Sequence, residues 1–193
     1  MKRKIILLGG GGHCKSCIDV IEQSEQFEIV GILDRQELVG EKVVGYTIIG
    51  TDEQINKLTE EHEFLITVGQ IHSAKLRKDL FYKLLTSHAK IATVISPRAH
   101  VSKYAIVQKG TIVMHDVLIN PDANIGKNCI LNSNALIEHD VVVEDHCHIS
   151  TGAILNGGVI VREGTFFGSN ATSKEYAETK RQDFIKANSL FLG

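Results

Sequence analysis

The sequence predicts an α/β unit of the Rossmann-like βαβ kind, followed by a parallel β-helix and a C-terminal helix. Three features support this prediction. An apolar strand pattern runs directly into four glycines and a helical pattern, an unbroken six-residue repeat extends from Thr93 to Gly168, and the repeat is lost after it. We therefore expect three segments, residues 1–96, 97–170 and 171–193.

The N-terminal segment begins with a buried strand at Lys4–Leu8, then four glycines and His13, then a helix from about Cys14 to Gln23. A glycine turn at a helix N-terminus presents free N–H groups and the positive end of the helix dipole, which suits a phosphate. Gly11, Gly12 and His13 are therefore candidate ligand-binding residues. The alternative is a tight turn without a ligand, because the fingerprint G-x-G-x-x-G is not met from Gly9.

Two further strands contribute candidates at their carboxyl ends. Glu28–Leu33 ends in Asp34, about twenty residues past the glycines, where an acidic side chain often contacts a ribose or a base. Phe64–Val68 ends in Gly69-Gln70. The carboxyl ends of parallel strands face one crevice. Asp34 and Gly69 are therefore expected beside the glycine turn, although Asp34 is as easily a simple turn residue.

The connections between these strands are less regular. Residues 39–50 predict an irregular or hairpin-like link, and Thr51 with Gln54 fits a capping box for a helix to about Glu61. Ser73 is expected to cap a second helix, whose apolar face runs from Leu76 to Leu85. A fourth strand, Ile91–Ile95, leads into the repeat.

The repeat has two columns that recur every six residues. One column is aliphatic or Phe at each position: Ile95, Val101, Val107, Val113, Ile119, Ile125, Leu131, Ile137, Val143, Ile149, Leu155, Val161 and Phe167. The other, two places earlier, holds small residues from Thr93 to Thr165. A helix repeats near 3.6 residues and a strand near 2, whereas a period of six is typical of parallel β-helices. Three hexads make one triangular coil, so residue i+18 is expected one strand spacing, about 4.8 Å, along the axis.

Composition limits the partners. With 43% hydrophobic and 23% charged residues the chain can bury a core, and a formal charge of -2 offers no polycation for nucleic acid or a membrane surface. No apolar run approaches the roughly 18 residues of a membrane span, and the N-terminus lacks the features of a signal peptide. We expect a cytoplasmic protein with small-molecule partners.

The cysteines and histidines raise the question of a metal-binding site. Cys14 and Cys17 form a C-x-x-C motif, but they share the apolar face of the first helix, and Cys129 and Cys147 fall in the small column, so all four are interpreted as core residues. Five histidines lie in the repeat without the close spacing of a metal site. We expect no metal.

His139 is the candidate general base. It follows Ile137 and Glu138 at a corner of the β-helix and precedes Asp140, which is able to orient it and stabilise its protonated form. The eighteen-residue rule places Gly157 and Gly158 one coil beyond His139, where a backbone N–H would hold an oxyanion. His148 lies half a coil away, so it would reach His139 only from a neighbouring subunit or another face.

The glycine start, Asp34, Val68-Gly69, the hexads and the segment Ile130–Asp140 together resemble the bacterial sugar acyltransferases of the sialic-acid O-acetyltransferase type. These are hexapeptide-repeat enzymes that include N-acetyltransferases of nucleotide-linked amino sugars. The resemblance implies a left-handed β-helix, a homotrimer with active sites between adjacent β-helices, acetyl-CoA as co-substrate and a place in surface-polysaccharide synthesis. It makes residues 1–96 the nucleotide-sugar-binding domain and 97–170 the acyltransferase domain.

The same resemblance assigns roles to individual residues. Gly11, Gly12 and His13 would contact the nucleotide sugar, with Asp34 near its base or ribose. His139 would take the proton of the sugar amine, with Asp140 as its acidic partner, in a direct attack on the thioester. Positions at the acyl and acceptor site and along the acetyl-CoA channel are matched by Asn132, His148, Gly157 and Gly168.

Two other functions stay open at this point, O-acetylation of a sugar such as sialic acid and a non-catalytic nucleotide-sugar scaffold. The end of the chain departs from the family pattern. The aliphatic column fails at Ser173, and Thr172 with Glu175 fits a capping box for a helix over Lys174–Ala187 that would close the β-helix. We therefore expect the β-helix to end near Gly168, without the lower coils that usually meet coenzyme A.

Overall fold

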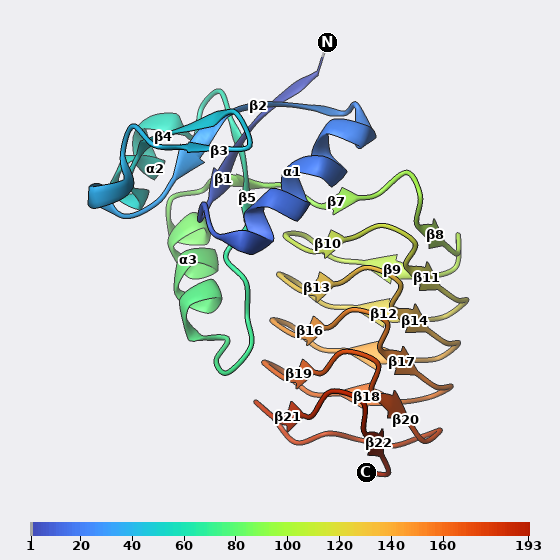
Figure 1. Cartoon of the computed structure of the whole chain (residues 1–193). Helices are drawn as coiled ribbons and strands as arrows, with labels where there is room; N and C mark the ends of the chain where they lie inside the picture. The colour runs from blue at the N-terminus through green and yellow to red at the C-terminus, as the bar shows by residue number, and fades with distance from the viewer. Residues whose placement is uncertain (1) are drawn as a thin grey trace.

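A computed structural model of the chain describes residues 2–193. An N-terminal α/β unit sits beside and above the upper coils of a left-handed parallel β-helix, and the chain winds down the β-helix to its C-terminus (Figure 1). No helix within residues 2–193 has the length and apolar character needed to cross a membrane.

The N-terminal unit is built on one six-stranded sheet with the order β3-β4-β2-β1-β5-β6. Its strands are β1 (Arg3–Leu8), β2 (Phe27–Leu33), β3 (Lys42–Val43), β4 (Tyr46–Gly50), β5 (Glu63–Ile66) and β6 (Lys90–Ile91). Its helices are α1 (Gly12–Ser24), η1 (Gln36–Leu38), η2 (Asp52–Gln54), α2 (Ile55–Leu58) and α3 (Lys75–Thr86). β1 pairs in parallel with both β2 and β5, so the residues after these three strands meet at one edge.

The predicted βαβ order is confirmed, with differences in the connections. Residues 39–50 contain an antiparallel hairpin of β3 and β4. The capping box at Thr51 is wrong, because Thr51 makes no side-chain cap hydrogen bond and the Gln54 amide packs against Gly50 instead. The helix there is short and ends at Leu58.

The β-helix has three faces of short parallel strands. The first face contains β7 (Val94–Ile95), β10 (Ile112–Val113), β13 (Ile130–Leu131), β16 (His148–Ile149), β19 (Phe166–Phe167) and β21 (Phe184–Ile185). The second contains β8 (His100–Val101), β11 (Leu118–Ile119), β14 (Leu136–Ile137), β17 (Ile154–Leu155), β20 (Thr172–Ser173) and β22 (Leu190–Phe191). The third contains β9 (Ile106–Val107), β12 (Asn124–Ile125), β15 (Val142–Val143) and β18 (Ile160–Val161).

Each strand pairs with the strand eighteen residues on, as the hexads predict; Ile112 pairs with Ile130, for example. Both predicted columns point inward, and from Val113 to Phe167 the aliphatic column is at most 1% exposed. Corners turn through residues with positive φ, which Asn, Asp and Gly adopt more readily than others. Asp116, Asp122, Asn134 and Asp140, for example, have φ between 59° and 62°. The hexads therefore encode both the core and the corners.

The predicted C-terminal helix is wrong. β20, β21 and β22 continue the first and second faces, and a bridge from Ile160 to Glu178 continues the third. Ser173 and Thr179 occupy the aliphatic column and are buried, and their hydroxyls accept hydrogen bonds from the backbone N–H groups of Asn156 and Arg162 in the preceding coil. Because hydroxyls satisfied in this way replace aliphatic side chains, the β-helix does not end at Gly168.

The N-terminal unit is packed onto the first face. One hydrophobic cluster runs without a break from α1 and the sheet into the β-helix, through Ile18, Val94 and Ile112 among others. His115 joins the two parts directly, because its ring nitrogens contact Asp19 of α1 and Ser96 at 2.7 Å each. This junction holds the strand ends of the N-terminal unit against the upper and middle coils.

Candidate active site

A cavity of about 1330 Å³ lies where the carboxyl ends of β1, β2 and β5 face the first corner of the β-helix. The N-terminal unit supplies the glycine turn, the ends of β2 and β5 and the start of α3, and the β-helix supplies His148 and the corner residues next to it. Every predicted substrate-binding residue lines this cavity: Gly11, Gly12, His13, Asp34, Gly69 and Asn132. A pocket of this size accommodates a ligand as large as a nucleotide sugar.

The glycine turn has two functional parts. Gly9 has a φ of 101°, and a Cβ there would lie 2.4 Å from Val68, so the turn can approach β5 only because Gly9 has no side chain. Gly11 and Gly12 begin α1, and a Cβ at either would meet no atom within 4 Å. The first part therefore shapes the turn, while the second leaves the α1 N-terminus open to the cavity.

Asp34 stabilises the turn from the end of β2. Its carboxylate accepts a hydrogen bond from the N–H of Gly10 at 2.6 Å and from that of Arg35 at 2.7 Å. Both carboxylate oxygens are thus engaged by backbone donors, although the side chain also lines the cavity. Asp34 shapes the phosphate-type turn in addition to facing the ligand space.

His13 and His148 meet at the floor of the cavity, with ring centroids 6.4 Å apart. His148 lies on β16, 7% exposed, and its Nδ1 contacts the Gln70 carbonyl at 2.5 Å while its Nε2 lies 3.2 Å from the Asn132 amide nitrogen. Because a carbonyl oxygen only accepts, Nδ1 carries the proton and Nε2 is the acceptor. Burial lowers the pKa of His148 to about 4 and that of His13 to about 3, so both rings are neutral at physiological pH.

Gln70 is a site residue whose place at the strand end the sequence predicts, but whose contacts it does not. It is 3% exposed, and its side-chain amide donates to the carbonyl of His146 at 2.9 Å, across the junction. The backbone carbonyl of Gln70 accepts the hydrogen bond from His148 Nδ1. Its position directly after Gly69, at the end of the β5 segment, was the available signal.

His139 and Asp140 lie at a different corner, after β14 and before β15, and neither lines the cavity. The His139 side chain is 58% exposed, and its Nδ1 contacts Asp140 Oδ2 at 2.7 Å. The hydrogen bond to Asp140 raises the pKa of His139 above its ordinary value. The pair has the geometry of an oriented general base, and the Cε1 and Nε2 edge of its partly exposed ring lies over Gly157.

The two remaining glycines have different surroundings. A Cβ at Gly157 would lie 2.8 Å from the His139 ring, so the predicted stacking of these residues is confirmed. The N–H of Gly158 donates to the His139 carbonyl, whereas the N–H of Gly157 donates no hydrogen bond to another group within residues 2–193. Gly168 is buried against Ile185–Ala187, and its N–H donates to the Ile185 carbonyl, so the structure does not bring it to a surface.

The structure therefore places the candidate residues in two separate regions. One is the cavity with its buried histidines at the corner between the first and second faces. The other is the exposed His139 corner between the second and third faces. Within one chain they are separated by the second face. Among residues 2–193, no group of three or more His, Cys, Asp or Glu residues is arranged to hold a metal ion.

Comparisons with known proteins agree with this architecture. Residues 4–84 match the family model of the PglD N-terminal domain, and residues 122–157 match that of the bacterial transferase hexapeptide, six repeats. No curated protein matches the chain.

Among solved structures, the acetyltransferase domain of PglB from Neisseria gonorrhoeae FA1090 is 25% identical, with a TM-score of 0.92 over 99% of this chain and 92% of that one. The same domain in complex with acetyl coenzyme A is 26% identical, with a TM-score of 0.90 over 97% of this chain and 89% of that one. A perosamine N-acetyltransferase from Caulobacter crescentus, in complex with CoA and GDP-perosamine, is 24% identical with a TM-score of 0.70, over 98% of this chain and 93% of that one, and shares the fold.

The match to the PglB domain extends over both halves of the chain, and each half has its own family model. The chain is therefore an enzyme, an acetyl-CoA-dependent acyltransferase, whose N-terminal part is similar to the PglD N-terminal domain and whose β-helix is similar to the bacterial transferase hexapeptide repeats.

Proposed function

We propose that this enzyme transfers the acetyl group of acetyl-CoA to the amino group of a nucleotide-linked amino sugar, in the synthesis of a bacterial surface glycan. One observation carries the proposal. The cavity joins a phosphate-type glycine turn to the β-helix surface at Asn132 and His148, so one ligand can place its phosphates at α1 and its sugar at the β-helix. The perosamine enzyme, which shares the fold, supports the same substrate class.

The ligand would lie with its diphosphate at the N–H groups of Gly11, Gly12 and His13. Asp34 and Gly69 would flank the nucleoside, and Asn132 would contact the sugar. His148 would meet the acetyl end of acetyl-CoA, and Gly157 would lie on the path of the cofactor. Gly168 retains only a packing role in this proposal because it is buried under the following coil.

The enzyme would act as a homotrimer, because within one chain the candidate residues lie in two separate regions. Aliphatic side chains point outward on both faces that flank His139. They are Leu118, Leu136 and Ile154 on the second face and Ile106, Val142 and Ile160 on the third, and all are partly or fully exposed. Burying them between β-helices would place the His139 corner of one copy against the cavity of the next.

The chemistry is then a direct acyl transfer. The neutral sugar amine attacks the thioester carbonyl carbon and forms a C–N bond, and the C–S bond breaks to release CoA as the thiolate, which receives the proton taken from the amine and leaves as the thiol. His139 Nε2 takes the proton from the amine nitrogen, while its Nδ1–H donates to Asp140. The Gly157 N–H would stabilise the oxyanion of the tetrahedral intermediate.

The test of substrate class is mass spectrometry of reactions that contain acetyl-CoA and a panel of amino-deoxy UDP-, GDP-, dTDP- and CMP-sugars. We expect a mass gain of one acetyl group on one nucleotide family, resistant to mild alkali because it is an amide. An alkali-labile product would indicate O-acetylation instead. No acetylated product with any nucleotide sugar would contradict the proposal.

Shared active sites are tested by mixing two inactive variants. In one variant, His139→Ala removes the base. In the other variant, Gly11→Phe fills the cavity with a side chain. Refolding the two together should restore part of the activity, because mixed trimers contain sites with an intact cavity from one subunit and an intact His139 from its neighbour. If mixed samples stay as inactive as the separate variants, each chain works alone.

A further inference from the structure

The buried guanidinium of Arg77 lies behind the cavity and has no carboxylate partner. Arg77 is on α3 and 1% exposed. Its Nη1 donates to the carbonyls of Ile66 and Val68 at 2.9 and 2.7 Å, and its Nη2 donates to the Oδ1 and carbonyl of Asn128 at 2.7 and 3.1 Å. No ion pair within residues 2–193 includes Arg77. All its acceptors are neutral oxygens.

The titratable groups around Arg77 carry no negative charge that would balance it. On the α1 side these are His13 and Cys17, and burial lowers the pKa of His13 to about 3 and raises that of the Cys17 thiol. On the β-helix side they are Cys129, His146 and His148, and burial lowers the pKa of each of these two imidazoles to about 4. A buried cation without a countercharge is costly, since removing it from water is not offset by a nearby anion.

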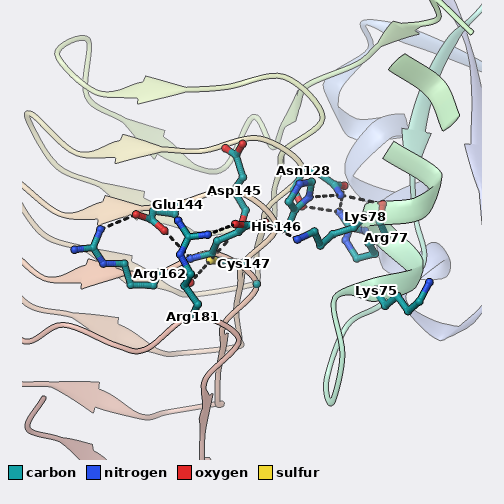
Figure 2. A network of polar contacts seen from close by, with 12 residues as sticks. Lys75, Arg77, Lys78, Asn128, Glu144, Asp145, His146, Cys147, Arg162 and Arg181 are labelled. Atoms are coloured by element: carbon teal, nitrogen blue, oxygen red, sulfur yellow. Dashed lines mark hydrogen bonds and ion pairs between the residues drawn. The ribbon is translucent and has the colours of Figure 1, made fainter. Parts of the chain in front are cut away.

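Three buried polar atoms at the same junction lack hydrogen-bond partners: His13 Nε2, Gln70 Oε1 and Arg77 Nε. His13 and Gln70 line the cavity, and Arg77 is joined to the cavity wall through the Val68 carbonyl. Buried polar groups in folded proteins are normally satisfied, so unsatisfied groups beside a cavity indicate that a polar ligand completes them. Figure 2 shows Arg77 next to Asn128 and His146, with Lys78 on the same helix directed to the β-helix.

From this geometry we infer that Arg77 is a positioning residue that gives the cavity an uncompensated positive charge, for which the diphosphate of the ligand is the countercharge. Arg77 does not touch the ligand. It fixes the end of β5 to the Asn128 corner and acts on the ligand through the low-dielectric junction. The inference rests on the proposed function, because it takes a nucleoside diphosphate as the ligand class.

Charge and geometry can be separated with two substitutions. Asn128→Asp keeps an acceptor for Arg77 Nη2 and makes it a carboxylate, which neutralises the charge, although it removes the Asn128 Nδ2 hydrogen bond to the Arg77 carbonyl and the Nδ2 contact with His146 Nδ1. Asp tolerates the φ of 53° at this corner. Arg77→Lys keeps the positive charge but loses the paired guanidinium hydrogen bonds to the carbonyls of β5 and to Asn128. Lys78→Gln is the control, because it removes a cation on the same helix that pairs with Glu163 outside the cavity.

The experiment measures binding of UDP, GDP and the matching uncharged nucleosides to the full-length protein by calorimetry. Asn128→Asp should weaken binding of the diphosphate that the wild type prefers by about tenfold or more, because the new carboxylate cancels the positive charge that attracts the phosphates. Binding of the nucleoside should stay the same. Arg77→Lys should keep most of the diphosphate affinity, and Lys78→Gln should keep all of it.

A second readout does not need the ligand. Imidazole pKa values measured by NMR in the apo protein should rise for His13 and His148 in Asn128→Asp but not in Lys78→Gln. The inference is overturned if Asn128→Asp leaves both diphosphate affinity and these pKa values unchanged, or if Arg77→Lys loses as much affinity as Asn128→Asp. If the wild type binds no nucleoside diphosphate, the proposed function fails separately, and the imidazole titration still reports whether Arg77 sets the charge of the junction.

Discussion

The two histidine environments of this chain are built in opposite ways. His148 is buried, bonded to a backbone carbonyl and held neutral, whereas His139 is exposed, bonded to a carboxylate and made more basic. Both lie one or two residues from a β-helix corner or strand end, so the hexads alone do not distinguish them. The difference comes from what packs outside: the N-terminal unit covers the first face at His148 and leaves the His139 corner open.

This contrast suits His148 to binding a ligand and His139 to moving a proton. A neutral imidazole with a fixed tautomer offers a constant hydrogen-bonding pattern between about pH 5 and 8. An exposed imidazole beside a carboxylate changes charge in or near that range, which is what a general base requires. Substitutions at His139, at His148 and at the neighbours of His139 test this division.

The largest effect is expected from His139→Ala. Loss of the general base should lower kcat by about 10² to 10⁴, with KM values for both substrates changed by less than about threefold. Steady-state kinetics with saturating acetyl-CoA separate the effect on kcat from the effect on KM. His62→Ala, which removes a histidine outside the cavity, is the control and should leave kcat unchanged. A His139→Ala enzyme with wild-type kcat would reassign the base.

The next largest effect is acid destabilisation through the buried imidazoles. A His148 with a folded pKa of about 4 binds fewer protons than in the unfolded chain, where its pKa is near 6.5. The contribution of neutral His148 to the free energy of unfolding is therefore fully present above about pH 6.5. It is lost as the pH drops toward 4, by up to about 3 kcal/mol.

Urea unfolding at several pH values measures this loss. In His148→Asn the free energy of unfolding should depend less steeply on pH over that range, with the dependence due to His13 remaining. An equally steep curve in the variant would show that His148 is protonated as easily when folded as when unfolded.

A smaller effect on turnover is expected from Gly157→Ala. The new methyl group would lie 2.8 Å from the His139 ring, so the imidazole must move while the backbone, which has no positive φ here, accepts alanine. A displaced base should lower kcat by about tenfold or more. The thermal unfolding temperature should change little, because the ring is exposed. Unchanged kcat would mean that the position of the ring does not limit the reaction.

The smallest effect is a shift in the pH profile of Asp140→Asn. Protonated His139 cannot accept a proton, so activity rises with pH through the His139 pKa, which Asp140 raises. Removing the carboxylate should lower that pKa and move the rising limb of kcat to lower pH, with a modest fall in the maximum. Asn also tolerates the φ of 60° at this corner. A rising limb that stays in place would show that Asp140 does not act on His139.

Much of the fold follows from spacing, and its errors have physical causes. The hexads predicted the faces, the stacking of Gly157 on His139 and the inward columns, because a period of six leaves few other structures. They did not predict the last coils, because Ser173 and Thr179 replace aliphatic contact with hydrogen bonds to the preceding coil. A hydrophobic pattern in the sequence does not show whether a buried hydroxyl accepts or donates a hydrogen bond.

The cavity was predicted in part. The strand-end residues were found because parallel strands align their carboxyl ends, a local rule. The role of Gln70, which was expected only as part of a strand end, and that of Arg77 were not predicted. Both roles depend on contacts to His146, His148 and Asn128, more than fifty residues away in each case. Leu76 was expected in the apolar face of its helix, yet it is 57% exposed and lines the cavity, so a pattern that usually marks the core here marks a ligand wall.

The strict corner spacing also limits how such an enzyme can change its length. Deleting one residue between two corners would turn every later side chain from inside to outside. Removing six would keep the interior filled but would carry all downstream groups around to the next face. Only a gain or loss of eighteen residues preserves both, so His139 can be moved along the axis relative to the nucleotide site only in whole turns.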